Sequence, residues 1–268
     1  ATMATGGFGT YDASIARFNS LAIEIVIIVF MFVAGVNFTL HYRLFRGEAK
    51  PLLRDPEFRL YASIVLVATA LVTLDLRLHV FAGFGESLRF AAFQVVSILT
   101  TTGFATANFD QWPAPSKFIL VVLMFIGGCA GSTGGAIKCL RLMIVVKQTF
   151  IELYRLIHPH AVLSVKIAKA AVPPEIVSSI RSFFFLYIAL ALSAMLALAL
   201  LGVDMVTAIS GVAATIGNVG PGLGLVNASS TYAGLPQAAK WVLSLCMLLG
   251  RLEIYTVLVL LVPDFWKK

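Results

Sequence analysis

The chain has 268 residues, of which 59% are hydrophobic and only 12% are charged. Because a soluble domain of this size carries about 25% charged residues, the composition excludes an ordinary soluble protein and predicts an integral membrane protein. The formal net charge of +7 would suit a nucleic-acid partner, but the positions of the charges along the chain give a different explanation.

The chain opens with ATMATGGFGTYDAS, a loop-like stretch with neither an initiator methionine nor the basic segment of a signal peptide. We therefore expect it to be part of a longer protein. Five long apolar segments follow, and each is long enough for a bilayer crossing, which takes about 20 residues. They lie at residues 21–40, 60–80, 118–146, 183–201 and 238–262. Two shorter apolar segments, 90–99 and 205–216, are expected to enter the membrane and turn back.

The order of long and short segments repeats along the chain. Twice, a crossing segment leads to a short segment and then to a second crossing segment, and residues 1–40 resemble the back half of a third unit. The stretches MATGGFGT, LTTTGFAT and AATIGNVG place small and hydroxyl residues before Gly6, Gly103 and Gly217. These glycines are 97 and then 114 residues apart, a spacing that predicts one helix–loop–helix unit per repeat.

Basic residues gather on one side of the predicted membrane. The linkers 41–61 and 138–181, with the two C-terminal lysines, hold 14 of the 20 Lys and Arg residues. The positive-inside rule makes this the cytoplasmic face. Acidic residues occur at the opposite mouths of the short segments: Asp12, Glu86, Asp110 and Asp204. Topology therefore accounts for the positive charge, and we expect no nucleic-acid partner.

The stretch ILTTTGFATANF, residues 98–109, follows the first short segment. We expect a helix that enters from outside, is capped by Glu86 and Ser87, and ends near Leu99 inside the membrane. The negative end of the helix dipole favours a cation nearby. Beyond it, glycine allows dihedrals that other residues resist, and backbone carbonyls of such loops can replace the hydration shell of potassium. The alternative is that the small residues only let helices pack closely.

Four motifs carry a resemblance to a known family: TMATGGF, TTTGFATANFDQWP, MFIGGCAGSTGGAIK, and IGNVGPG with LGRLE. Over essentially all 268 residues, the chain resembles the C-terminal half of the TrkH branch of the Trk/Ktr/HKT potassium-transporter superfamily. The resemblance implies an all-α membrane protein of repeated helix–pore loop–helix units, of potassium-channel type, around a pseudo-fourfold pore. Residues 1–45 would end the second repeat, 58–150 would form the third and 181–268 the fourth, with cytoplasmic linkers at 46–57 and 151–180.

The resemblance also implies a potassium-binding filter with a glycine in every repeat. Three of the four filter loops would lie in this chain, and the fourth would precede residue 1. The expected filter residues are Ala4, Thr5, Gly6, Gly7, Thr101, Thr102, Gly103, Phe104, Thr215, Ile216, Gly217 and Asn218.

A glycine-rich stretch, residues 124–138, interrupts the third long apolar segment. As one straight helix, residues 118–146 would be over about 40 Å long, more than a hydrocarbon core of about 30 Å, so we expect an unwound centre. A phosphate-binding loop is excluded because Gly-Lys-Ser/Thr is missing. The TrkH family has an intramembrane gate loop here, and the resemblance assigns that role to Gly127, Gly128, Gly131, Ser132, Thr133, Gly134 and Gly135.

Arg251 lies within the last long apolar segment, where a charge costs about 2.5–3.5 kcal/mol and marks a functional candidate. The resemblance makes it a pore-facing barrier beside the gate loop. The alternative is a structural ion pair, for example with Glu24. Glu253 is two residues further on and points to another helix face, and we assign no role to Glu24, Asp75 or Glu253.

Together these features predict potassium uptake by a multi-pass protein of the bacterial inner membrane, with no cofactor and no enzymatic activity. The alternative is a proton- or sodium-coupled symporter that alternates access and uses Glu24 or Asp75 as its coupling site. An intramembrane protease using Ser132 would need a base, and His79, at the far end of the segment 60–80, is the one histidine in a predicted crossing segment.

The remaining expectations concern partners and isolated side chains. The resemblance implies a homodimer in membrane lipid and a cytosolic nucleotide-binding regulatory subunit of the TrkA type, for which the basic linker is a sensible docking site. We expect His158 and His160 at the surface rather than as metal ligands, and Lys138 reaching toward the cytoplasmic end. The spacing of the three cysteines, Cys129, Cys139 and Cys246, predicts neither a disulfide framework nor a zinc site.

Overall fold

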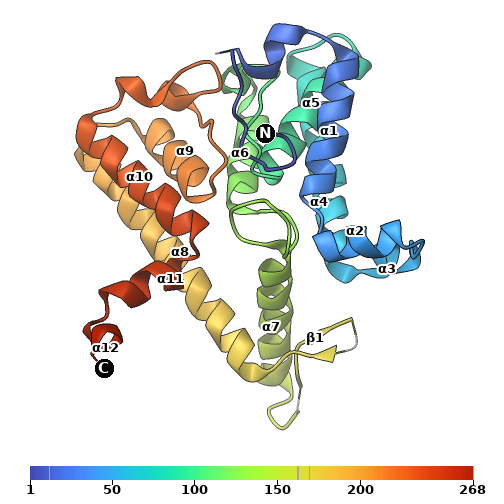
Figure 1. The fold of residues 1–268 in the computed structure, drawn as a ribbon, viewed down its shortest axis with the longest axis vertical. Helices are drawn as coiled ribbons and strands as arrows, with labels where there is room; N and C mark the ends of the chain where they lie inside the picture. The colour runs from blue at the N-terminus through green and yellow to red at the C-terminus, as the bar shows by residue number, and fades with distance from the viewer. Residues whose placement is uncertain (12, 162, 169, 268) are drawn as a thin grey trace.

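Two groups of helices make up most of the chain, and each surrounds one short helix (Figure 1). The computed structural model describes residues 1–11, 13–161, 163–168 and 170–267. The first group comprises α1 (Leu21–Ala34), α4 (Pro56–His79), α5 (Phe84–Leu99) and α6 (Ala114–Phe125), and the second comprises α8 (Pro174–Leu200), α9 (Met205–Ile216) and α10 (Gln237–Arg251). The expected helical fold is confirmed.

Smaller elements connect and extend these groups. Between the groups, α7 (Cys139–Ile157) runs to a two-stranded antiparallel sheet of β1 (Lys166–Ile167) and β2 (Ala170–Ala171). The remaining helices are α2 (Phe38–Phe45), α3 (Lys50–Arg54), α11 (Ile254–Leu258) and α12 (Pro263–Trp266). Single 3-10 turns are η1 (Ser14–Phe18), η2 (Phe109–Gln111), η3 (Gly224–Val226), η4 (Tyr232–Gly234) and η5 (Val259–Leu261).

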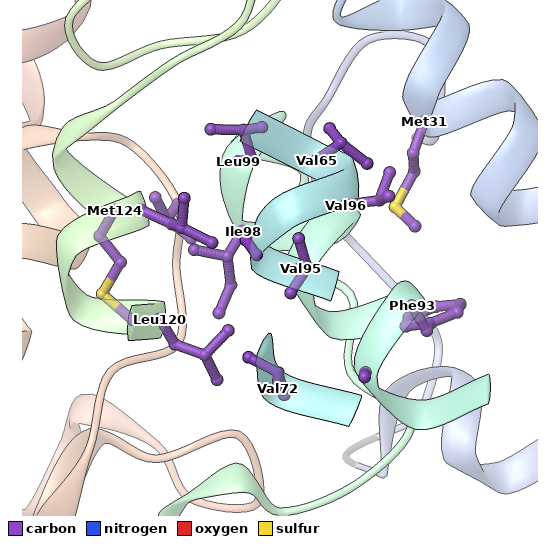
Figure 2. Packing of buried hydrophobic residues seen from close by; sticks show 14 of the residues in the cluster. Met31, Val65, Val72, Phe93, Val95, Val96, Ile98, Leu99, Leu120 and Met124 are labelled. Carbon is purple, nitrogen blue, oxygen red and sulfur yellow. The ribbon is translucent and has the colours of Figure 1, made fainter. Parts of the chain in front are cut away.

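The short helix α5 is the centre of the first core. Figure 2 shows Ile98 and Leu99 of α5 packed in one cluster with side chains of α4, α6 and α1. The neighbours it labels on those three helices are Val65, Val72, Leu120, Met124 and Met31. Every residue from Phe93 to Leu99 is buried, so protein rather than lipid surrounds the inner half of this helix. That is where an interrupted helix can be tolerated inside a membrane.

The second group repeats this plan with α9 at its centre. Helix α9 has the bounds predicted for the second short segment, residues 205–216, and is buried from Ser210 onward. Asp204 caps it by accepting a hydrogen bond from the Thr207 amide at 3.1 Å. Hydrogen bonds from the Thr207 hydroxyl and amide hold the pKa of Asp204 below its usual value. The predicted cap of α5 is wrong, because Gly83 precedes that helix and Ser87 instead donates its hydroxyl to the Gly83 carbonyl.

Two helices, α4 and α8, are long and apolar enough to cross a bilayer alone, and α1 and α2 qualify together but are bent by 105°. The predicted crossing at residues 21–40 is therefore divided between two helices rather than formed by one. The chain turns after Ala34, where Gly35 packs against the Tyr61 hydroxyl without room for a β-carbon. Asn37 then starts α2 by accepting a hydrogen bond from the Thr39 amide.

Two other predicted crossings are broken helices. The break expected within residues 118–146 is confirmed, because α6 ends at Phe125 and α7 begins at Cys139. The segment 238–262 was expected to be continuous, but α10 ends at Arg251 and Glu253 has a left-handed φ of 57°. Arg141 holds this turn through an ion pair of 2.8 Å with Glu253.

The connection between the groups is also shorter than predicted. Helix α7 continues to Ile157 and α8 already begins at Pro174, so residues 158–173 replace the expected linker 151–180. His158 and His160 are exposed there, as expected. Three charged residues of the predicted topology, Asp12, Lys169 and Lys268, lie outside the described residues.

A buried ion pair joins α1 to α5. Arg89 donates from Nε and Nη2 to the two carboxylate oxygens of Glu24, each at 2.6 Å, and the Glu24 side chain is 2% exposed. This bidentate geometry is the strong form of a carboxylate–arginine contact. Glu24 is therefore the partner of Arg89 and not, as the alternative reading proposed, of Arg251.

We expect Arg89→Ala to lower the free energy of unfolding by about 3 kcal/mol, because it leaves the Glu24 carboxylate buried without its cation. Unfolding in detergent, followed by circular dichroism, measures the change. Lys267→Ala is the control, since its partner Asp264 is exposed and such pairs contribute little. Equal stability of the two variants would contradict the structural role of the pair.

Candidate functional site

The same backbone turn occurs at three places in the chain. We call residues 4–8 the first loop, 100–104 the second loop and 217–221 the third loop. In each, a non-glycine residue and the glycine two positions later both have positive φ. The values are 49° and 61° for Thr5 and Gly7, 56° and 82° for Thr101 and Gly103, and 55° and 113° for Asn218 and Gly220. The second loop directly follows α5, and the third directly follows α9.

The three loops also have the same pattern of backbone hydrogen bonds. In each, the amide of the left-handed residue donates to the carbonyl three residues back, and the next amide donates to the carbonyl five residues back. The pairs are Thr5 to Thr2, Gly6 to Ala1, Thr101 to Ile98, Thr102 to Ser97, Asn218 to Thr215 and Val219 to Ala214, at 2.7–3.2 Å. The loops are therefore equivalent residue by residue.

This equivalence corrects the predicted register of the repeat. The sequence matched Gly6, Gly103 and Gly217, whereas the structure matches Gly7, Gly103 and Gly220. Gly217 has ordinary right-handed dihedrals because it caps α9, and the predicted filter residues Thr215 and Ile216 are still helical. Small residues before a glycine occur at several offsets, and only the backbone shows which residue reverses.

The loops also lie against one another in a fixed order. A β-carbon on Gly7 would overlap the carbonyl oxygen of Thr102 in the second loop. A β-carbon on Gly103 would overlap the carbonyl oxygen of Val219 in the third loop. These are equivalent contacts, because Gly7 corresponds to Gly103, and Thr102 corresponds to Val219. The first loop therefore abuts the second in the same way as the second abuts the third.

Main-chain carbonyl groups of these loops have no donors. Among the described residues, no hydrogen bond reaches the carbonyl oxygens of Thr5, Gly6, Thr101, Thr102, Asn218 or Val219. Thr101, Thr102 and Val219 are buried. A buried carbonyl without a partner costs free energy, and more so at membrane depth. A cation or ordered water beside these oxygens would supply the missing partner.

Buried side chains hold the second and third loops in place from behind. Ser97 of α5 donates its hydroxyl to the Phe104 carbonyl at 2.6 Å. In the second group, Ser210 of α9 accepts from the Leu223 amide at 2.9 Å. The hydroxyls of Thr100 and Thr102 lie 2.8 Å apart. Each short helix thus fixes the return path of the chain that follows it.

The glycine-rich segment between α6 and α7 contacts all three loops; we call residues 126–138 the glycine loop (Figure 1). Thr133 donates its hydroxyl to the Met3 carbonyl, and its own carbonyl accepts from the Thr5 hydroxyl, both at 3.0 Å. Gly135 donates its amide to the Thr101 hydroxyl at 2.7 Å. A β-carbon on Gly135 would overlap the Gly217 carbonyl.

Two cationic side chains bind carbonyl groups of this loop. Arg251 donates from Nη1 to the Thr133 carbonyl at 3.1 Å. Lys138 donates to the Gly134 carbonyl and, at 3.4 Å, to the Ser132 hydroxyl. The expectation that Lys138 reaches toward the cytoplasm is wrong, because the loop carbonyls are its nearest acceptors. Both cations line a cavity of about 220 Å³ together with residues 132–136.

The predicted gate residues do not all lie in the same surroundings. Gly127 and Gly128 are buried beside the ends of α7 and α1, where β-carbons would overlap or crowd the carbonyls of Gly135 and Gly35. Ser132 through Gly135 instead face the three loops and Arg251. Gly131, with φ of 72°, lies where the two parts join.

The two acidic residues considered for ion coupling are bound to other side chains. Glu24 pairs with Arg89, and Asp75 accepts from the Ser116 hydroxyl at 2.5 Å and contacts His79 at 3.1 Å. Sequence reasoning missed a third acidic residue, Glu57, which binds the glycine loop. Its position directly after the proline that begins α4 gave no signal of that contact.

The similarity to known proteins extends over the whole chain. Residues 1–268 match the family described as TrkH, cation transport protein. The chain is 43% identical over 272 residues to the Trk system potassium uptake protein TrkH of Halomonas elongata, and 42% identical over 270 residues to that of Escherichia coli K12. These alignments cover 100% of the chain and 55% and 56% of the relatives, so the chain spans about half of their length.

A solved structure gives the same result. The crystal structure of the potassium transporter TrkH from Vibrio parahaemolyticus superimposes with a TM-score of 0.92 at 41% identity. The match covers 99% of this chain and 57% of that one.

We expect Gly103→Ala to destabilise the protein more than Gly202→Ala. Both glycines have nearly the same φ, 82° and 83°, so both variants carry the left-handed cost of about 1–2 kcal/mol. Only at Gly103 does the new β-carbon also meet a carbonyl, that of Val219, which adds roughly 1–3 kcal/mol of overpacking. Thermal unfolding in detergent compares the two, and an equal loss would contradict the close contact of the second and third loops.

Proposed function

This chain belongs to the TrkH family of cation transport proteins, and we propose that it forms part of a potassium uptake pathway across the bacterial inner membrane. The family is one of transporters rather than enzymes. Its apolar helices make the chain a membrane protein, and the relatives are named potassium uptake proteins.

One observation carries this proposal: three equivalent loops abut in order and leave their main-chain carbonyls without donors. Rings of such carbonyls can replace the hydration shell of potassium. The filter then consists of the first, second and third loops, with Gly7, Gly103 and Gly220 at equivalent positions. A fourth loop from outside these 268 residues would complete the ring beside Gly220.

The glycine loop acts as the gate in this proposal. Ser132 through Gly135 lie against the filter loops, so an ion leaving the filter would meet them next. Arg251 adds a positive charge bound to the Thr133 carbonyl, which both holds the gate and repels a cation. Movement of this segment would open the path.

The symporter alternative has weaker support. Its candidate coupling residues, Glu24 and Asp75, are engaged with Arg89 and Ser116 on α5 and α6. A carboxylate held in a buried bidentate pair is poorly suited to repeated protonation, because breaking the pair leaves a buried charge. We therefore favour passive conduction over alternating access.

The partners expected from the resemblance remain proposals. They are a second copy of the protein and a cytosolic nucleotide-binding subunit of the TrkA type. The end of α7 supports a docking role, because Leu156 and Ile157 are exposed next to the basic residue Arg155, and Lys166 of β1 is also exposed. A partner docking there would contact both an apolar surface and positive charge.

We expect Gly103→Ser to reduce the preference for potassium over sodium by about tenfold, equivalent to about 1.4 kcal/mol. The added side chain would displace the Val219 carbonyl and distort the ring. Rubidium flux into vesicles bearing the complete transporter, with sodium as competitor, measures the ratio. An unaltered ratio would count against the filter assignment.

Replacing Arg251 with alanine should raise cation flux several-fold, because it removes both the charge and the hydrogen bond to Thr133. The same vesicle assay applies, with expression checked by immunoblot. Lys267→Ala removes an exposed positive charge on α12's flank and serves as the control. Unchanged or lower flux at normal expression would remove Arg251 from the gate.

A further inference from the structure

Glu57 joins the first half of the glycine loop to the start of α7 through one carboxylate oxygen. It is the second residue of α4, and it is 6% exposed. Its Oε1 accepts from the Ala130 amide at 2.6 Å and from the Leu140 amide at 2.9 Å. Ala130 lies in the first half of the glycine loop, and Leu140 lies in the first turn of α7.

The half of the loop that Glu57 binds is also tied to other elements. Cys129 donates its amide to the Gly35 carbonyl at 2.8 Å, and the Phe38 amide donates to the Gly131 carbonyl at 3.1 Å. Both contacts connect the loop to the bend between α1 and α2. Residues 126–131 are therefore fastened to α1, α2 and α4, and we call them the loop base.

The following residues, 132–135, are bounded by two left-handed residues, Gly131 at 72° and Ala136 at 52°. They contact the filter loops, Arg251 and Lys138. They also contact the loop base, where the Ser132 amide donates to the Cys129 carbonyl and the Gly135 carbonyl lies against Gly127. We call residues 132–135 the loop tip. A short segment between two reversed residues can change direction without disturbing its flanks, because φ and ψ changes concentrate at those positions.

We propose that Glu57 is a positioning residue that clamps the loop base to α4 and α7, so that gating moves the loop tip alone. This inference rests on the proposed gate role. Hydrogen bonds from amides to a buried carboxylate are charge-assisted and among the strong ones. Without the carboxylate, the amides of Ala130 and Leu140 lose their acceptor at a buried site, and the base loosens.

The chain offers a matched control in the second group of helices. Glu175 is also the second residue of its helix, α8, and also follows a proline. It is exposed. Glu175→Ala therefore removes the same side chain from an equivalent helix position without touching the glycine loop.

The test uses Glu57→Ala, Glu57→Gln and Glu175→Ala in the complete transporter in vesicles. Rubidium flux reports the gate, and labelling of native cysteines by a membrane-permeant maleimide reports the loop. Cys129 and Cys139 flank the clamp and are fully buried, and Cys246 in α10 is a buried internal reference. Mass spectrometry gives the labelling rate at each thiol.

For Glu57→Ala we expect flux and the labelling rates of Cys129 and Cys139 to rise by about threefold to tenfold, with Cys246 unchanged. Glutamine keeps an oxygen that both amides can reach, so Glu57→Gln should stay within about twofold of the parent. Glu175→Ala should match the parent in both measurements.

Three results would overturn the clamp: parental flux and labelling in Glu57→Ala, equal effects of the Ala and Gln variants, or an equal rise at Cys246. The last would indicate general loosening of the fold. If the parent protein shows no potassium-selective flux, the proposed function fails, yet the thiol comparison still tests the clamp.

Discussion

Hydrogen bonding inside each filter loop is unequal between amides and carbonyls, and the rest of the structure depends on this inequality. Within the described chain, the amides of Thr101 and Thr102 donate back to the end of α5, while their own carbonyl oxygens have no donor. The other two loops repeat the pattern. A polypeptide can hold such carbonyls in a membrane only if protein surrounds them and a ligand satisfies them. The buried short helices supply the first condition, and a permeating cation would supply the second.

The position of the glycine loop also follows from the need to give backbone groups hydrogen-bond partners. Unwinding the helix between Phe125 and Cys139 frees backbone groups, and several find partners on other elements or on charged side chains. Amides bind Gly35, Glu57 and the Thr101 hydroxyl, while carbonyls bind Arg251 and Lys138. A charged residue inside an apolar segment is costly. Here Arg251 offsets part of that cost by satisfying a carbonyl that the break exposes.

Part of this architecture could be predicted from the sequence. Composition indicated a membrane protein, the short segment 205–216 coincides with α9, and the length of residues 118–146 required a break that the structure contains. The repeat was also recognised, although its register was wrong by one residue at Gly7 and by three at Gly220. These successes share a cause, because hydrophobic length and glycine content act locally on the backbone.

The sequence by itself thus determined a helical membrane protein, the short helix at 205–216 and the break within residues 118–146. The tertiary structure decided which residue of each loop reverses, why α1 bends after Ala34, and which groups bind Glu24, Lys138, Arg251 and Glu57. Hydropathy and glycine content indicate the local backbone conformation of a segment. The partner of a buried charge or of a crowded glycine instead comes from a helix far away in the chain. Such contacts, between residues up to 130 positions apart, leave no periodic trace in the sequence.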